Sequence, residues 1–290
     1  MPAPPNLPAA LFHHAAVHAG EPWLFHAEGW DWRWHTWGEV AREVMARAEG
    51  LSEIAAGSRY PFAYTARPED IVLDLAVQAA GLVSQPMSSP PPPSPPRPSS
   101  PAPSLPATPG EEGEKQEEAV FFPSPGVVGR EGAGEGAGVR ARAGGAAVVR
   151  DGEPVELSAA DLIAMAEQLQ KQIGSTSRRD IVVLSGPLEI PEERAMLAWA
   201  TLAGAAVVLE PNPALRVATA AWVRPTVFHG TAAELAALRS WVEKERKGWL
   251  RRGPRLPFRR LRSVLVTGPE ALRAEEEAFW AERGVRIGRI

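Results

Sequence analysis

Hydrophobic positions along the chain alternate between helical spacing and short runs of strand length. One helical repeat begins at Thr36 and ends at Gly50 or Gly57, and the next begins at Pro68 and ends at Gly81. The same criteria predict helices at 158–173, 191–203, 231–247 and 269–282 and from Pro213, and strands at 60–65, 82–85, 181–185, 205–209, 226–228, 263–267 and 285–287. Strands separated by helices favour parallel pairing through right-handed crossovers. We therefore predict an α/β fold, layered α/β/α, with one or two mostly parallel sheets.

Two segments of this pattern repeat each other. Pro68 opens a helix with two acidic residues, and Gly81 follows thirteen residues later; Pro191 and Gly204 have the same spacing and the same acidic first turn. Each glycine precedes an apolar strand and then a proline. Self-similarity at this level predicts two related α/β units. In such sheets ligands bind beyond the carboxyl ends of strands, which directs attention to the loops after Ser185, Leu209, Phe228 and Thr267.

The middle of the chain has a different composition. Eleven of the 23 residues from Ser88 to Gly110 are proline, an acidic run follows at 111–118, and eight of the 20 residues at 126–145 are glycine. Such a composition cannot build a core. We predict a disordered insertion at 88–145 that separates a first α/β part, 1–87, from a second, 146–290. The insertion is interpreted as a spacer, although Pro93 to Pro96 also fits the PxxP pattern of SH3 ligands.

Bulk properties limit the classes of partner. A net charge of −4 and a pI near 5.9 give no global field for nucleic acid or anionic lipid, and the absence of cysteine excludes disulfides, thiolate metal sites and a cysteine nucleophile. Histidines interrupt the first twenty residues, and the longest apolar run, 195–209, is too short to span a bilayer. We predict a cytoplasmic protein with no transmembrane segment and no nucleic-acid partner.

Several short motifs occur in an order typical of one enzyme superfamily. The front part contains Trp23-Leu24-Phe25, Thr36-Trp37-Gly38-Glu39-Val40 and Ala80-Gly81, and the back part contains Gly186-Pro187-Leu188 with Glu193-Arg194, then Arg224-Pro225-Thr226-Val227-Phe228 and Ser263-Val264-Leu265-Val266-Thr267-Gly268. This order resembles the adenylate-forming, or AMP-binding, superfamily, and within it the AMP-forming acyl-CoA synthetases, closest to long-chain fatty-acid CoA ligases.

The resemblance implies ATP-dependent activation of a carboxylate as an acyl-adenylate, followed by transfer to CoA, with ATP, Mg²⁺ and CoA as cofactors and a fatty acid or acyl ligand as substrate. It places the remnant of a phosphate-binding loop at Gly152-Glu153-Pro154 and a turn bordering the adenine and acyl pockets at Thr267-Gly268-Pro269. His229-Gly230-Thr231 is expected to face the same crevice as part of a substrate pocket. Pro269 is also expected in the first turn of a helix, where proline has a structural role.

This sequence departs from the family pattern at the phosphate loop. The Lys-Gly pair is missing, no serine or threonine occurs between Pro125 and Leu157, and Glu156 stands near the place of the family's lysine. Polyphosphate binding needs hydroxyls, backbone N–H groups and a cation. The given sequence also ends at Ile290, before the family's Tyr-Gly-x-Thr-Glu motif and C-terminal lysine. We expect a truncated member with no catalytic residue, no cofactor for this chain alone and no activity alone.

Two alternatives remain open. In the first alternative, the chain is half of a split ligase that a partner polypeptide completes. In the second, it is a non-enzymatic interaction module. The second alternative would use the proline-rich insertion and the segment from Arg239 to Arg262, in which ten residues are Lys or Arg and two are Glu.

Histidines and tryptophans supply further candidates. As a general base, His229 has no visible partner, so its turn is expected at the surface or as a helix cap. His14 and His18 share a helix face, but the spacing fixes no third ligand, and we predict no metal site. Trp32 and Trp34 alternate with Trp30 on one side of a strand or hairpin and are expected to cover a core or an interface rather than to stack on bases.

Overall fold

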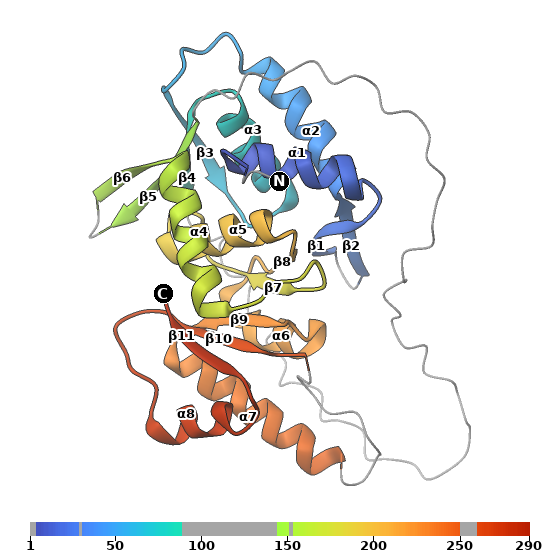
Figure 1. Ribbon diagram of the computed structural model, residues 1–290, viewed down its shortest axis with the longest axis vertical. Helices are drawn as coiled ribbons and strands as arrows, with labels where there is room; N and C mark the ends of the chain where they lie inside the picture. The colour runs from blue at the N-terminus through green and yellow to red at the C-terminus, as the bar shows by residue number, and fades with distance from the viewer. Residues whose placement is uncertain (1–3, 29–30, 89–143, 151–152, 250–259) are drawn as a thin grey trace, which may run out of the picture. The chain divides into compact units, whose positions relative to one another are not determined.

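The computed structural model describes residues 4–28, 31–88, 144–150, 153–249 and 260–290 (Figure 1). The predicted insertion lies outside the described residues except for its ends, Ser88, Gly144 and Gly145. The division of the chain at 88 and 145 stays a prediction. Within the described part, segments from both sides of the insertion share sheets and a hydrophobic core, as the strand order shows.

The strands form two sheets, and both are parallel except for an antiparallel hairpin at one edge. The larger sheet has the order β11-β10-β9-β7-β8-β1-β2, and the smaller has the order β3-β4-β5-β6. The larger sheet comprises β1 (Pro22–Glu28), β2 (Asp31–Thr36), β7 (Ile181–Leu184), β8 (Ala206–Leu209), β9 (Val227–Gly230), β10 (Ser263–Val266) and β11 (Arg286–Arg289). The smaller comprises β3 (Arg59–Tyr64), β4 (Val83–Ser88), β5 (Gly145–Arg150) and β6 (Glu153–Ser158). The predicted α/β class with mostly parallel sheets is confirmed.

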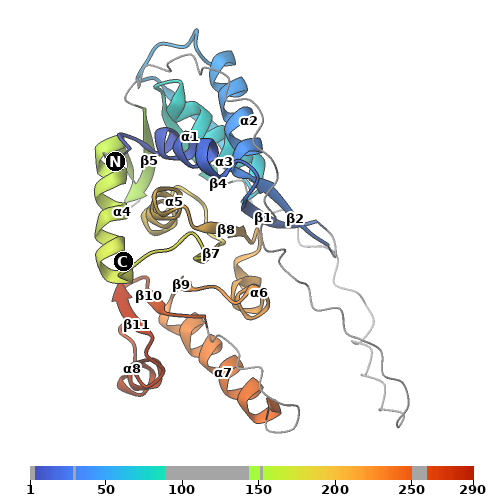
Figure 2. The same cartoon turned by 45° about the vertical axis from the view of Figure 1, so that its right-hand side comes forward.

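The helices fall into two groups by the core that they cover. The described helices are α1 (Leu7–His18), α2 (Trp37–Gly50), α3 (Pro68–Ala79), α4 (Ala159–Ile173), α5 (Pro191–Ala203), the 3-10 turn η1 (Pro213–Leu215), α6 (Arg216–Val223), α7 (Ala232–Trp249) and α8 (Ala274–Ala281). Helices α1 to α5 share one hydrophobic cluster with both sheets, whereas α6, α7 and α8 share a second cluster with the larger sheet. Figure 2 shows α6, α7 and α8 on one side of β9 and β10 and α4 and α5 on the other.

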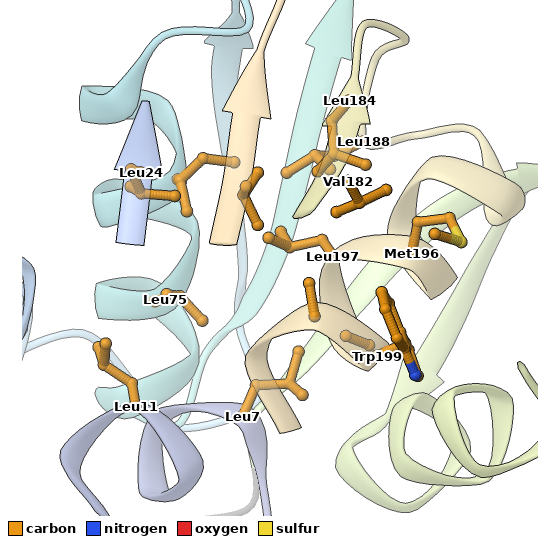
Figure 3. Packing of buried hydrophobic residues seen from close by; sticks show 14 of the residues in the cluster. Leu7, Leu11, Leu24, Leu75, Val182, Leu184, Leu188, Met196, Leu197 and Trp199 are labelled. Carbon is orange, nitrogen blue, oxygen red and sulfur yellow. The ribbon is translucent and has the colours of Figure 1, made fainter. Parts of the chain in front are cut away.

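Side-chain alternation along the strands explains why both faces of the larger sheet are covered. Val182 and Leu184 pack in the cluster with α5, and Val183 between them packs in the cluster with α6 and α7. Figure 3 shows Val182, Leu184 and Leu188 against Leu197 of α5. Successive side chains of a strand point to opposite faces, so a strand covered on both sides is apolar at every position. This is the reason that the sequence of β7 shows no polar alternation.

The internal repeat reappears in the backbone. Helices α3 and α5 both begin with proline, and both are followed by a glycine in the left-handed region, Gly81 with φ +80° and Gly204 with φ +71°. Each glycine leads into the next parallel strand, β4 or β8. The related α/β units predicted from spacing are therefore built with the same helix start and stop.

Three expectations about elements were wrong. The helix predicted at 269–282 begins only at Ala274, because Gly268, with φ +82°, turns the chain and Arg273 holds the extended N-cap conformation. The β5–β6 hairpin was not predicted, because its strands carry Gly145 and Pro154, which weaken a strand pattern. Strand β9 includes His229 and Gly230, two residues beyond the predicted end.

Candidate functional site

The carboxyl ends of the central parallel strands bring polar side chains to one edge of the larger sheet. Ser185 follows β7, Glu210 follows β8, His229 lies near the end of β9 and Thr267 follows β10. Ser185, Glu210 and His229 are all buried. This is the edge at which the strand pattern predicts a ligand site.

An ion-pair cluster closes part of this edge. Glu193, in the first turn of α5, accepts a hydrogen bond at Oε1 from Nη2 of Arg216, and Nε of Arg216 donates to Oγ of Ser185. Nε2 of His229 lies 3.1 Å from the same Oε1 of Glu193. We name Ser185, Glu193, Arg216 and His229 the edge cluster. All four side chains are buried, with His229 only 1% exposed.

Local structure positions each member of the edge cluster. His229 alternates with Phe228 along β9, so its ring shares the α5 side of the sheet with Val227, while Phe228 packs toward α6 and α7. The loop from β7 to α5 passes directly over Glu193. A Cβ at Gly186 would lie 2.6 Å from Cγ of Glu193, so only glycine fits where this loop crosses the carboxylate.

Charges around Glu193 keep it ionised. Burial on its own would raise the pKa of Glu193, but the neighbouring His229 and Arg216 side chains and a hydrogen bond from the backbone of Gly186 lower the pKa to about 2. Nε2 of His229 lies 3.1 Å from Oε1 of Glu193, although neither ring nitrogen meets full hydrogen-bond geometry with a described residue. Oε2 of Glu193 is buried and also lacks such a partner among the described residues.

Thr231 and Glu234 extend the site toward α7. Oγ1 of Thr231 accepts from the backbone N–H of Glu234 at 3.2 Å, and Oε2 of Glu234 accepts from the backbone N–H of Thr231 at 2.8 Å. This capping box gives Thr231 the helix-capping role expected for its turn. His229, at the start of the same turn, is not at the surface but buried, with its Nε2 beside Glu193.

The residues matched to the phosphate loop lie in the other sheet. Gly152 lies outside the described residues, and Glu153 and Pro154 belong to β6, in register with Arg150 and Val149 of β5. Their backbone therefore forms part of a strand pair. Glu156, at the place of the family's lysine, forms an ion pair of 2.5 Å with Arg59 of β3, and both side chains are about half exposed.

The predicted turn after β10 contacts β9 but not a helix start. The backbone N–H of Thr267 donates to the carbonyl of Gly230 at 2.9 Å, which brings two of the predicted site segments together. Gly268 and Pro269 continue in a loop, because α8 begins at Ala274. Pro269 therefore does not lie in the first turn of a helix, contrary to the expectation.

A second buried ion pair lies between α3 and α5. Nη1 of Arg194 contacts both carboxylate oxygens of Asp74, at 2.6 and 2.7 Å, and both side chains are 0% exposed. Asp74 also accepts from Gln78 and Ser84, and Nε of Arg194 donates to the carbonyl of Leu188. The pair joins the parts of the chain before and after the insertion.

Sequence reasoning did not assemble the edge cluster, although a signal existed. In the sequence, Glu193 belongs to a family motif and Ser185 ends a predicted strand. Arg216 is the one charged residue between Pro213 and Val223. An isolated charge in an apolar helix is a sign of a buried partner, because an unpaired buried charge is unfavourable.

The histidines of α1 and of the β1–β2 hairpin make contacts of other kinds. His14 approaches the carbonyl of Leu202, His18 lies 3.2 Å from Glu21, and His26 stacks on His35 across the β1–β2 hairpin. In the part of the chain that the structure describes, no three His, Asp or Glu side chains gather as a metal site would require. Nor does any described helix have the length and apolar character needed to cross a membrane.

Comparison with solved structures identifies the fold. The chain superposes on the nonribosomal peptide synthetase FmoA3 with a TM-score of 0.66 and 15% identity, covering 97% of this chain and 30% of FmoA3. It superposes on CmiS6 with a TM-score of 0.66 and 18% identity, covering 100% of this chain and 72% of CmiS6. A fatty acyl CoA synthetase from Mycobacterium tuberculosis gives a TM-score of 0.64 and 13% identity, with 98% of this chain and 58% of that protein covered.

The class of fold is therefore that of the adenylate-forming synthetases, and the resemblance predicted from the motifs is confirmed at the level of fold. The chain spans less than a third of FmoA3 and somewhat more than half of the mycobacterial synthetase. No family model matches the sequence, and no curated protein matches it.

Proposed function

We propose that this chain is an adenylate-forming-like domain that binds an acyl ligand but does not by itself activate it with ATP. The observation that carries this proposal is the edge cluster. At the carboxyl edge of the larger sheet, where ligands bind in such folds, Glu193 and Arg216 neutralise each other instead of facing a ligand.

The charges favour exclusion of a nucleotide. A polyphosphate is stabilised by cations, hydroxyls and backbone N–H groups that have no other partner. Arg216 is already engaged by Ser185 and Glu193, Glu193 is ionised, and Glu234 lies 3.7 Å from Arg216. At the segment that matches the phosphate loop, Glu153 on β6 adds negative charge, and Glu156 is paired with Arg59 where the family has its lysine.

The acyl class of ligand rests on the family resemblance, which is closest to long-chain fatty-acid CoA ligases. A fatty acyl CoA synthetase is among the structural neighbours. An apolar chain needs a hydrophobic surface rather than phosphate ligands, so loss of the phosphate loop does not remove this binding role.

The test separates ligand binding from catalysis. Calorimetry with Mg·ATP and with fatty acids of different chain length is combined with ATP–pyrophosphate exchange on the 290-residue chain. We expect fatty-acid binding, no exchange and no measurable binding of Mg·ATP. Micromolar affinity for Mg·ATP, or exchange that depends on a fatty acid, would contradict the proposal.

A second candidate is one half of a split ligase. The chain covers only 58% of the mycobacterial synthetase, so a second polypeptide is able to supply the remainder. The exchange assay repeated with the product of a neighbouring gene tests this candidate, which predicts activity in the mixture and none in either protein alone.

The interaction-module alternative depends on segments that lie largely outside the described residues. Deletion of residues 88–145, followed by a search for a lost binding partner, tests the proline-rich insertion. Substitution of the arginines between Arg239 and Arg262 tests the basic segment in the same way.

A further inference from the structure

Arginines gather at the amino edge of the larger sheet, at the opposite ends of the strands from the edge cluster. Strands β7, β9, β10 and β11 are parallel neighbours, and their first residues lie side by side, because Ser263 pairs with both Val227 and Arg286. Neighbouring strands are about 4.8 Å apart, so residues at their amino ends form a row. We name the arginines of this row the basic edge: Arg179 before β7, Arg224 before β9, Arg260 before β10 and Arg286 at the start of β11.

The side chains of the basic edge are available to a partner. All four arginines are exposed, and within the part of the chain that the structure describes none of them forms an ion pair or a side-chain hydrogen bond. Two further arginines nearby are already engaged, because Arg178 pairs with Glu21 and Arg262 pairs with Asp180. Those two carboxylates are therefore neutralised by other arginines and do not offset the charge of the basic edge.

An exposed tryptophan adjoins the basic edge. Trp222 is 72% exposed and lies two residues before Arg224, at the end of α6, where the chain turns toward β9. Its neighbours Ala220 and Ala221 are buried in the cluster shared with α7, so α6 presents the indole on its outer side. An exposed indole beside cations is typical of a membrane-binding surface, because the ring lies at the headgroup level while the cations meet anionic lipid.

Charge and aromatic character together favour a lipid surface over other anionic partners. Each arginine close to an anionic bilayer strengthens binding about fivefold, and the effect is confined to groups near the surface. The net charge of −4 does not oppose this contact, because charges more than about 8 Å away are largely screened at physiological ionic strength. An acidic peptide would be bound by the arginines alone and would gain little from Trp222.

We propose that the basic edge and Trp222 form a docking surface for an anionic lipid bilayer. The four guanidinium groups contact the anionic headgroups, and the indole of Trp222 inserts between them. The carboxyl edge, at the other end of the same strands, faces away from the bilayer and remains open to a ligand. Membrane docking is therefore independent of acyl binding, because the two use opposite edges of the sheet.

Cosedimentation of the full chain with lipid vesicles measures this docking. Vesicles of phosphatidylcholine alone are compared with vesicles that also contain about 30% phosphatidylserine, at ionic strengths of about 0.1 M and about 0.5 M. The wild type is expected to bind the anionic vesicles at least about tenfold more strongly than the neutral ones at the lower ionic strength. Most of this preference is expected to disappear at the higher ionic strength, because exposed charges are screened by salt.

A double variant tests the arginines. Arg179→Gln combined with Arg224→Gln is expected to weaken binding to the anionic vesicles about 25-fold. The matched control is Arg42→Gln combined with Arg273→Gln, which removes the same net charge from two exposed arginines, one in α2 and one at the N-cap of α8. It is expected to change binding by less than about twofold, because charges distant from the bilayer are screened. Circular dichroism and urea denaturation confirm that each variant is folded.

A single variant tests the tryptophan. Trp222→Gln is expected to weaken binding to both kinds of vesicle, and the loss persists at the higher ionic strength, because salt does not screen burial of the indole. Trp34→Gln is the control, because Trp34 is 51% exposed on β2, away from the basic edge, and no change in binding is expected.

Three results would overturn the proposal. The wild type would bind anionic vesicles no more strongly than neutral ones, the two arginine double variants would weaken binding equally, or Trp222→Gln would bind like the wild type. A fluorescein-labelled acidic peptide and an oligonucleotide are titrated in parallel. Tighter binding of either one than of anionic vesicles, lost in Arg179→Gln with Arg224→Gln, would assign the basic edge to that class of partner instead.

Discussion

Arg194 and Asp74 form an ion pair with no exposure to solvent. The contribution of such a pair to the stability of the protein depends on how well its hydrogen bonds satisfy the two charges. Taking two charges out of water carries a large desolvation penalty, which is offset here by two Arg194 contacts and by hydrogen bonds from Gln78 and Ser84. Such a pair is not a strong source of stability compared with apolar residues. Its partners nevertheless depend on each other, because either one alone would be an unpaired buried charge.

Arg194→Met is expected to lower the free energy of unfolding by about 3–5 kcal/mol, because Asp74 is left buried without its cation. Urea denaturation measures the change. The double variant Arg194→Met with Asp74→Leu is expected to lose less than the single variant. Arg47→Met, which breaks a partly exposed pair with Glu43, serves as the control and is expected to cost about 1 kcal/mol or less. Equal losses in Arg194→Met and Arg47→Met would contradict this account.

Glu193 links stability to acid pH. Its pKa in the folded protein is about 2, below the ordinary value of 4.5, so the unfolded chain binds its proton first as pH falls. The stabilisation is therefore complete above about pH 5 and is lost as the pH falls from there toward 2. The full difference is on the order of 3 kcal/mol.

Glu193→Gln removes this titration. Between pH 6 and pH 3 the wild type is expected to lose about 2 kcal/mol more stability than the variant, measured by urea denaturation at each pH. The comparison uses the change in the free energy of unfolding between the two pH values, so the lower overall stability expected of Glu193→Gln does not affect it. Parallel pH profiles for the two proteins would show that Glu193 is not held ionised by His229 and Arg216.

Glycine ends both helices of the repeated α/β unit, and the two ends have the same physical requirement. A residue with a Cβ is strained in the left-handed region, where Gly81 and Gly204 lie. A Cβ at Gly204 would also lie 2.9 Å from Cε1 of His14. The proline-to-glycine spacing that reveals the repeat in the sequence therefore reflects the same glycine requirement at the C-terminal ends of α3 and α5.

Gly204→Ala is expected to destabilise the protein by about 1–2 kcal/mol, from backbone strain and the contact with His14. The midpoint of thermal or urea unfolding reports the loss. Gly20→Ala is the control, because a Cβ there meets nothing within 4 Å and its φ is not positive. A Gly204→Ala variant as stable as Gly20→Ala would exclude a structural requirement for the left-handed C-cap.

Elements with a strong hydrophobic period were predictable, and contacts between distant residues were not. The sequence from Pro191 to Leu209 displays a helix, a glycine stop and a strand, and the structure has each of them. The edge cluster pairs Glu193 with His229, 36 positions along the chain, and no local pattern encodes that contact. The β5–β6 hairpin was missed because its glycine and proline resemble loop residues.

At the scale of the whole molecule, the parts of the chain before and after the insertion belong to one sheet system. Val83 and Ser84 of β4 pair in parallel with Gly145 and Ala146 of β5. Strand β1 pairs in parallel with β8 in the other sheet. The fold thus depends on both flanking parts.

Replacement of residues 89–143 by a flexible linker of about fifteen residues is expected to leave the free energy of unfolding within about 1 kcal/mol of wild type. A linker of this length spans the roughly 20 Å from the end of β4 to the start of β5, and shortening a loop changes closure entropy only slowly. Denaturation curves and circular dichroism check the result. Loss of cooperative unfolding in the shortened protein would show that the segment contributes to the fold.

The buried Asp74–Arg194 contact also makes the two sides of the chain useful as a split reporter. Each fragment from a cut between Ser88 and Gly144 carries one member of the pair, so neither is expected to fold to a native core when expressed alone. Fusing the fragments to two proteins that associate would bring the charges together and restore the fold. Reassembly would then signal, inside a cell, that the fused proteins had met.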